Sequence, residues 1–429
     1  MQTAFTTDQL ATPRIAEANT ILRKCVHCGF CTATCPTYVL LGDELDSPRG
    51  RIYLIKNMLE SGEPATAETV KHLDRCLSCL SCMSTCPSGV HYMHLIDEAR
   101  AHVEETYERP LFERQLRNVL AYTMPRPVLF RLSLIAAKLA SPLAPLARSF
   151  GATRIAALLG LVPKTLPAPE RFGQPGTYPA QGPKKGRVAL LMGCVQSVLD
   201  PGINAATIRL LNRLGFEVVV SGEESCCGSL THHMGKEEDA LARARRSVDQ
   251  WIKAEVDAVI ITASGCGTTV KDYGHMLRLD PAYAEKAKAI AEKAKDVTEF
   301  LAAQNLPEGA GGLRLAYHSA CSMQHGQKIR AEPLKLLRRA GFSVMEVPEG
   351  HLCCGSAGTY NILQPEIARN LRDRKVANIE SLQPQAIATG NIGCMTQIGS
   401  GTAIPILHTI ELLDWAYGGP RPEKLGTTE

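Results

Sequence analysis

The spacing of apolar residues predicts helices early in the chain and alternating strands and helices in its last part. Residues 12–24 and 91–108 are polar and helix-favouring. A helix is also expected over 49–60, because Ser47 can cap its N-terminus and Pro48 fits its first turn. From residue 187, short apolar runs alternate with amphipathic stretches such as 204–214 and 333–340. This pattern predicts two β-α-β-α-β units with parallel sheets. The expected strands are 187–192, 216–220, 256–262, 315–317, 342–347 and 386–389.

A basic, apolar segment stands between these two parts. From residue 114 to residue 169 the chain has no Asp or Glu. The same window holds eight bases: Arg114, Arg117, Arg126, Arg131, Lys138, Arg148, Arg154 and Lys164. A basic amphipathic helix pair of this kind can lie on an anionic membrane surface. The alternatives are a helical hairpin that covers the N-terminal part and a docking surface for a partner subunit. Residues 163–186, rich in Pro, Gly and Lys, are predicted to be a linker.

One cysteine pattern occurs twice in the N-terminal part. Both copies follow C-x2-C-x2-C-x3-C-P, and they comprise Cys25, Cys28, Cys31, Cys35 and Pro36, then Cys76, Cys79, Cys82, Cys86 and Pro87. Bacterial two-cluster ferredoxins hold a pair of 4Fe-4S clusters with this spacing. Gly29 supports the tight curl that the loop needs, because it has no Cβ. The runs therefore predict two 4Fe-4S clusters and a role in carrying electrons.

In such proteins three cysteines of each run bind one cluster and the fourth binds the other. On this crossed assignment one cluster is held by Cys25, Cys28, Cys31 and Cys86, and the second by Cys76, Cys79, Cys82 and Cys35. A zinc site is the alternative, but zinc usually uses two separated C-x2-C pairs. The 40 residues between the runs favour a helical ferredoxin module over the compact β type. Within them, residues 42–51 combine three acids with two arginines, which indicates either a salt-bridged loop that braces the clusters or a docking site.

The remaining eight cysteines form a second duplication. They are Cys194, Cys226, Cys227 and Cys266, followed by Cys321, Cys353, Cys354 and Cys394. Equivalent cysteines are separated by 127 or 128 residues, and a Cys-Cys-Gly-Ser stretch occurs in both sets. Each cysteine follows the carboxyl end of a predicted strand, where the ligands of open α/β sheets bind. Four thiols from three loops can therefore converge in each repeat and hold a further cluster or act in redox chemistry.

Two alternatives bear on these C-terminal residues. The thiols could be redox-inert, since buried cysteine often acts as a small apolar residue. The histidines nearby are His232, His233, His318 and His325. Such histidines are more often loop or core residues than ligands.

Composition narrows the functional classes. The chain has 429 residues, which predicts two or three domains, and a formal net charge of +4, which is too small to indicate nucleic-acid binding. Residues 1–23 lack the apolar core of a signal peptide, and no run reaches about 18 uninterrupted apolar residues. Together with the metal-type cysteine spacing, this predicts a protein of the reducing cytoplasm. The chain also lacks a G-x-G-x-x-G motif after a strand and a P-loop.

With both cysteine systems placed, the chain resembles the iron-sulfur subunits of bacterial glycolate oxidase (glycolate dehydrogenase). The resemblance runs nearly end to end and rests on residues 25–38, 42–56, 72–79, 262–267, 351–360 and 391–394. It implies a helical two-cluster ferredoxin module followed by a duplicated α/β cysteine-rich (CCG) domain. The expected domains are 1–110, a connector and linker over 111–186, and repeats over 187–310 and 311–429.

The resemblance implies that this subunit passes electrons from flavoprotein subunits, where glycolate becomes glyoxylate, to a quinone or another acceptor. The chain itself is then not expected to bind substrate or flavin, and it stays cytoplasmic or peripheral on the cytoplasmic face of the inner membrane. Iron-sulfur subunits of lactate or glycerol-3-phosphate dehydrogenases are related alternatives, and a non-redox metal-binding scaffold is one of another class. The related heterodisulfide-reductase type ends each repeat in C-x2-C, but here Thr269 and Gln397 occupy those positions. We therefore expect four thiols per repeat, which suit a simpler cluster or a disulfide.

Overall fold

A computed structural model describes residues 1–163, 165–170 and 172–426. Residues 1–110, called the N-terminal module below, are helical as predicted, and their elements are α1 (Thr7–Leu10), α2 (Pro13–Lys24), α3 (Pro36–Leu41), η1 (Glu44–Asp46), α4 (Pro48–Ser61), α5 (Ala67–Asp74), α6 (Ser81–Thr85) and α7 (Tyr92–Thr106). Ser47 caps α4 through its side chain, as expected. Leu22, Ile55, Leu73 and Leu95 are fully buried, so α2, α4, α5 and α7 share one core.

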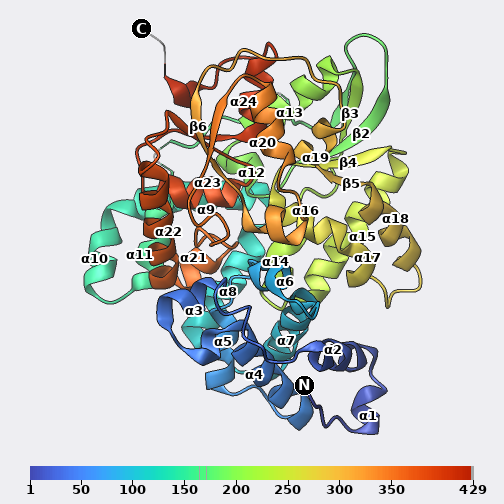
Figure 1. Cartoon of the computed structure of the whole chain (residues 1–429), viewed down its shortest axis with the longest axis vertical. Helices are drawn as coiled ribbons and strands as arrows, with labels where there is room; N and C mark the ends of the chain where they lie inside the picture. Colours follow the sequence, from blue (N-terminus) through green and yellow to red (C-terminus); the bar gives the residue numbers. More distant parts are fainter. Residues whose placement is uncertain (164, 171, 427–429) are drawn as a thin grey trace.

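The basic apolar segment folds as helices around the side of the molecule (Figure 1). They are α8 (Leu111–Thr123), α9 (Pro127–Ala140), η2 (Ser141–Leu143), α10 (Ala144–Ser149) and α11 (Thr153–Gly160). Leu116, Leu120 and Phe130 pack against Val198 and Ile362, so this segment bridges both halves of the C-terminal part. Lys164, one of the eight predicted bases, lies outside the described residues.

The first repeat contains a five-stranded sheet in the order β1-β3-β2-β4-β5. All pairings are parallel except that of β1 with β3. The elements are β1 (Gly176–Tyr178), β2 (Gly186–Leu191), α12 (Gln196–Leu199), α13 (Gly202–Arg213), β3 (Phe216–Val220), α14 (Ser229–His233), α15 (Glu237–Lys253), β4 (Ala258–Ile261), α16 (Ser264–Lys271), α17 (Tyr273–Met276), α18 (Ala284–Lys293), β5 (Ala294–Asp296) and α19 (Val297–Ala302).

The second repeat reproduces this arrangement with four parallel strands in the order β7-β6-β8-β9. Its elements are β6 (Arg314–His318), η3 (Ser322–Gly326), α20 (Glu332–Arg339), β7 (Ser343–Glu346), α21 (Tyr360–Leu363), α22 (Pro365–Glu380), β8 (Ala386–Thr389), α23 (Ile392–Gly399), β9 (Ile406–His408), α24 (Thr409–Ala416) and η4 (Glu423–Leu425). Strands β2, β3, β4 and β5 thus correspond to β6, β7, β8 and β9. The duplicated α/β fold that we predicted is confirmed.

Three short strands depart from the prediction. Strands β5 and β9 extend each repeat by one parallel edge strand. Strand β1 lies inside the predicted linker 163–186 and pairs antiparallel with β3 from Gly176↔Val220 to Tyr178↔Val218. Each of these strands has three residues, which is too short to produce a recognisable apolar alternation.

The N-terminal module packs against both repeats (Figure 1). The Tyr360 hydroxyl donates to the Arg75 carbonyl (2.9 Å), and the Ser84 hydroxyl lies 2.9 Å from His325 Nδ1. On the first repeat, the Lys236 ammonium binds the Glu104 carboxylate (2.6 Å). These contacts bring the N-terminal cysteine loops against the loops that follow the strands.

Candidate functional site

The two N-terminal cysteine loops share one backbone path. His27 and Ser78, two residues after the first cysteine of each run, have φ values of 55° and 49°. Two residues further on, Gly29 and Leu80 have φ values of 85° and 61°. Gly29 adopts this left-handed conformation without strain, whereas Leu80 is held in it by burial. The matched conformations give the two loops the same sequence of turns.

The structure groups these eight cysteines around two small cavities. The walls of one include Cys25, Cys28, Cys31 and Cys86, and those of the other include Cys35, Cys76, Cys79 and Cys82. Cys82 also borders the first cavity, so the two cavities are neighbours. Each cavity therefore receives three cysteines of one run and the fourth of the other.

Donors surround the second cavity. Arg51 Nη1 and the Tyr92 hydroxyl each lie 3.8 Å from a thiol, on Cys35 and Cys76 respectively. Burial raises the pKa of Cys31 to about 11 and that of Cys79 well above its usual range. Such thiols ionise when they bind a metal, since the metal charge compensates the thiolates. The donor set therefore fits iron-sulfur clusters.

Asp46 braces the loop that lies under the second cavity. The carboxylate is fully buried and contacts Arg51 (3.2 Å), His72 Nδ1 (2.9 Å) and Arg75 (2.7 Å). Arg51 in turn donates to the His72 carbonyl at 2.7 Å. Within residues 42–51, Asp46 and Arg51 thus belong to a buried ion cluster, whereas Glu44 and Arg49 pair in a more exposed position.

In the first repeat the four cysteines come from three loops. Cys194 follows β2, the Cys226–Cys227 pair follows β3, and Cys266 lies in α16 after β4. Their thiols form a continuous chain of contacts from Cys194 through Cys226 and Cys227 to Cys266. Hydrogen bonds from the Cys194 and Cys227 thiols hold the pKa of Cys226 well below its usual range.

The second repeat has the same chain of thiols, from Cys321 through Cys353 and Cys354 to Cys394. In both repeats the glycine after the cysteine pair has positive φ, 82° at Gly228 and 88° at Gly355. A Cβ on Gly355 would lie 2.4 Å from the Ala368 carbonyl, so only glycine fits there. The Gly355 amide can then donate to Cys353 Sγ (3.4 Å).

One cavity of about 250 Å³ connects the two C-terminal sets. All eight of their cysteines line it, together with Cys76 and Cys79 of the N-terminal module. Leu77 belongs to the same apolar cluster as Cys321 and Cys353, and Cys79 packs against that cluster. The second repeat is therefore the one in contact with the N-terminal thiols. All sixteen cysteines lie within the described residues, and no disulfide joins any two of them.

Among the nearby histidines, His318 stands apart. His232 and His233 face Asp97, and His325 contacts Ser84. His318 is 1 % exposed, and neither ring nitrogen has a hydrogen-bond partner among the described residues. The His318 ring and the thiols of Cys354 and Cys394 offer atoms that lie within 4.8 Å of one another. Its first-repeat equivalent is Leu191, since both end their strands in the same register.

Lys375 was not foreseen from the sequence. It lies on α22, is 2 % exposed and donates to the Glu349 carbonyl (2.8 Å). Burial lowers its pKa, while Cys321, Cys354 and Cys353 act in the opposite direction. A lysine in the middle of a polar helix carries no sequence signal that it is buried.

Comparison with known proteins gives two family matches. Residues 24–90 match the 4Fe-4S dicluster domain, and residues 188–271 and 315–399 each match the cysteine-rich domain. The glycolate oxidase iron-sulfur subunit of Escherichia coli is 46 % identical over 97 % of this chain and 99 % of its own length. The probable glycolate oxidase iron-sulfur subunit of Bacillus subtilis is 33 % identical over 92 % and 94 %.

More distant matches cover part of the chain or the fold alone. The lactate utilization protein A of Bacillus licheniformis is 30 % identical over 53 % of this chain and 99 % of its own length. A crystal structure of a hypothetical protein from Helicobacter pylori superimposes with a TM-score of 0.54 at 10 % identity. That superposition covers 98 % of this chain and 75 % of the other.

Proposed function

This chain belongs to the family of glycolate oxidase iron-sulfur subunits, and we propose that it takes electrons from flavoprotein subunits that oxidise glycolate to glyoxylate. It is an iron-sulfur electron-transfer subunit of an oxidoreductase complex. Substrate and flavin are bound by the partner subunits, and the acceptor is a quinone or another carrier. A non-redox scaffold is not supported, because both family matches are to iron-sulfur or cysteine-rich domains.

The eight N-terminal cysteines are the proposed ligands of two 4Fe-4S clusters. One set is Cys25, Cys28, Cys31 and Cys86, and the other is Cys35, Cys76, Cys79 and Cys82. When bound, such clusters supply one-electron carriers that divide a two-electron oxidation into single steps. The protein's own contribution is to bury the thiols and to donate hydrogen bonds from Arg51 and Tyr92.

The proposal for the C-terminal cysteines rests on one contact. Cys79 packs against the apolar cluster that includes Cys321 and Cys353, which favours the thiols of the second repeat as the next site for an electron. We assign a further cluster to Cys321, Cys353, Cys354 and Cys394, with His318 as an additional ligand. The thiols of the first repeat line the same cavity and form a second candidate cluster or redox site; they are Cys194, Cys226, Cys227 and Cys266.

Iron content tests this arrangement. We expect anaerobically purified protein to contain more than about eight irons, which two full cubanes supply. Changing both Cys353→Ser and Cys354→Ser should lower the iron and acid-labile sulfide, but not below about eight. An unchanged count would confine the iron to the N-terminal module, and fewer than about eight irons in the wild type would overturn the two-cluster assignment.

The substrate is tested on the complex with its partner subunits. Anaerobic addition of glycolate should bleach the visible absorbance of this chain, while lactate and glycerol 3-phosphate should act much more slowly. Lactate is the informative comparison, because lactate utilization protein A matches about half of this chain. Faster bleaching by lactate or by glycerol 3-phosphate would show that the chain serves a lactate or a glycerol-3-phosphate dehydrogenase instead.

We further propose that helices α9 and α10 rest on the anionic surface of the inner membrane. Within the described residues, Pro127–Ala147 is the one helical stretch with the length and apolar character of a membrane span, and 11 % of its most apolar window is buried. Leu132, Ile135 and Leu139 are exposed there, alongside Lys138. Because residues 114–169 contain no Asp or Glu that would repel anionic lipid, this face suits binding at the membrane interface.

A further inference from the structure

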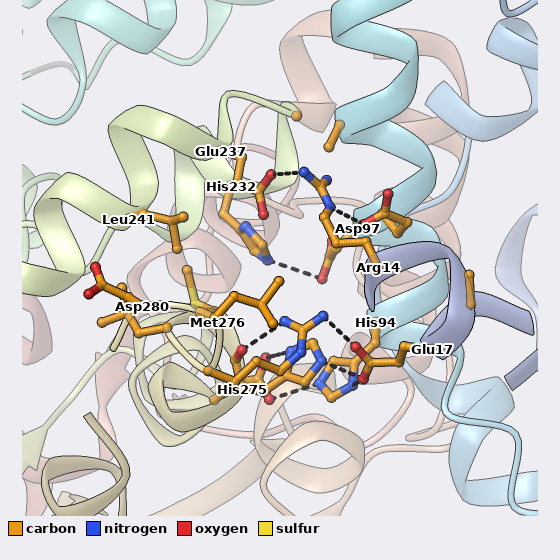
Figure 2. Close-up of a pocket in the computed structure, with 18 of the residues that line it drawn as sticks. Arg14, Glu17, His94, Asp97, His232, Glu237, Leu241, His275, Met276 and Asp280 are labelled. Carbon is orange, nitrogen blue, oxygen red and sulfur yellow. Dashed lines mark hydrogen bonds and ion pairs between the residues drawn. The ribbon is translucent and has the colours of Figure 1, made fainter. Parts of the chain in front are cut away.

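Histidines gather at a second place in the molecule, away from the thiols. Five of the twelve, His91, His94, His232, His233 and His275, lie where the N-terminal module meets the first repeat. A cavity of about 370 Å³ opens there, and Figure 2 shows its walls. Helices α2 and α7 supply one side of it, and α14, α15 and α17 supply the other.

Two of these imidazoles form a pair with one carboxylate at its edge. The rings of His94 and His275 stack with centroids 3.3 Å apart and planes 4° apart. Glu17 Oε1 lies 2.7 Å from His275 Nε2 and 3.7 Å from His94 Nδ1. Figure 2 shows all three side chains meeting beside the cavity. Their potential ligand atoms all lie within 4.8 Å of one another.

A second carboxylate occupies the opposite edge of the pair. Asp272 Oδ1 is 2.9 Å from His94 Nε2, and Asp272 Oδ2 is 3.7 Å from His275 Nδ1. A carboxylate in this position takes the N–H of a metal-binding imidazole and fixes its tautomer. His94 Nδ1, which faces Glu17, then presents its lone pair. His275 Nε2 is hydrogen-bonded to Glu17 and has to release its proton when a metal binds. Asp272 thus holds the histidine pair from the edge opposite Glu17.

The remaining charges at the cavity are largely matched. Arg14 pairs with Glu98 and Glu237 (2.7 Å each), and Arg245 pairs with Asp280 (2.7 Å). Arg278 binds the other oxygen of Glu17, which orients that carboxylate and leaves Oε1 facing the histidines. The histidine pair thus has a carboxylate at each edge, an arrangement that favours a cation.

We propose that Glu17 Oε1, His94 Nδ1 and His275 Nε2 bind a zinc ion that joins the N-terminal module to the first repeat. Imidazole and carboxylate suit zinc, and three protein ligands leave a fourth position open towards the cavity. Because a ring nitrogen binds metal in its own plane, the stacked rings have to tilt as the ion enters, and both rings border the cavity. The site is independent of the proposed electron-transfer role, since none of its ligands is a cysteine.

Zinc binding to the cluster-loaded full chain tests the proposal. We expect about one zinc ion to remain after gel filtration, with iron content unchanged. Zinc X-ray absorption should show ligands at about 2.0–2.1 Å, as for nitrogen and oxygen, and not the distance of about 2.3 Å typical of sulfur. The His275→Gln variant should lose this zinc, and Asp272→Asn should weaken binding by about 10- to 100-fold.

The matched control is His102→Gln, which changes another histidine of α7 that contacts the Glu63 carbonyl. This variant should keep wild-type zinc affinity. The iron content of every variant reports whether it is folded and loaded. The proposal is overturned if the loaded chain retains no zinc, if the zinc has sulfur ligands, or if His275→Gln binds zinc as tightly as the wild type. Equal losses in His102→Gln and His275→Gln would also overturn it.

Discussion

The imidazole of His318 is enclosed beside two thiols with neither nitrogen hydrogen-bonded among the described residues. A buried polar group without a partner costs free energy, so its retention here indicates a ligand. We expect His318→Leu to fold at least as well as the wild type, because leucine is the residue at the equivalent position of the first repeat. The same variant should lose the iron assigned to the second repeat.

Iron content and pulsed EPR check this prediction. The reduced wild-type protein should show nitrogen coupling that His318→Leu lacks. His325→Gln is the control, since that ring contacts Ser84 and the His351 carbonyl. If His318→Leu keeps both its iron and the nitrogen coupling, His318 is not a ligand.

Arg51 and Asp46 form the buried ion pair under the second cluster site. Replacing Arg51 breaks this buried pair and leaves the Asp46 carboxylate with Arg75 and His72 alone, which costs up to about 3–5 kcal/mol. We therefore expect Arg51→Met to lower the free energy of unfolding by about this amount and to speed cluster loss. Combining it with Asp46→Asn should recover part of the stability, since the amide carries no charge.

Anaerobic denaturant unfolding measures this effect. Lys253→Met is the control, because Lys253 pairs with Glu223 in an exposed position (81 % and 62 %). Exposed pairs contribute about 1 kcal/mol or less. Equal effects from Arg51→Met and Lys253→Met would show that the buried cluster does not brace the loop.

Helix α9 presents its apolar side outward, with Leu139 81 % exposed and Leu132 57 % exposed. Changing both leucines to glutamate should reduce binding to anionic vesicles by about 100-fold or more, because each buried leucine contributes about 1.5–3 kcal/mol. Sedimentation with phosphatidylglycerol-rich vesicles measures this, and binding should weaken as salt rises.

Leu279→Glu is the matched control for α9, because Leu279 is a 53 % exposed leucine of the first repeat. It should leave vesicle binding unchanged. If the wild-type chain does not bind anionic vesicles and the partner subunits protect α9 from proteolysis, this helix is a subunit interface instead.

Local spacing predicted much of the molecule. The twin cysteine runs, the period of 127 or 128 residues and the strands before each cysteine all follow from positions along the chain. The edge strands β1, β5 and β9 were missed, because three residues show no periodicity. The sequence places His318 near the cysteines but does not favour it as a ligand, since an imidazole at a strand end is usually an ordinary core residue.

What the sequence could not predict was which repeat lies next to the N-terminal thiols. The cysteine spacing of the two repeats is nearly identical, so it does not indicate which repeat contacts the N-terminal module. The difference comes from tertiary contacts, chiefly Leu77 and Cys79 against Cys321 and Cys353. The Tyr360 hydrogen bond to Arg75 adds to them. Such contacts join residues up to 285 positions apart and leave no local pattern.

The shared cysteine cavity also constrains how the protein is made. Its walls include Cys76, near the start of the chain, and Cys394, close to its end. A ribosome therefore releases the N-terminal module long before the last wall exists, and domains generally fold in that order. During this interval Leu77 and Cys79 lack the cover that the second repeat later provides. We therefore expect iron to reach Cys79 more readily during this interval than after the second repeat has folded.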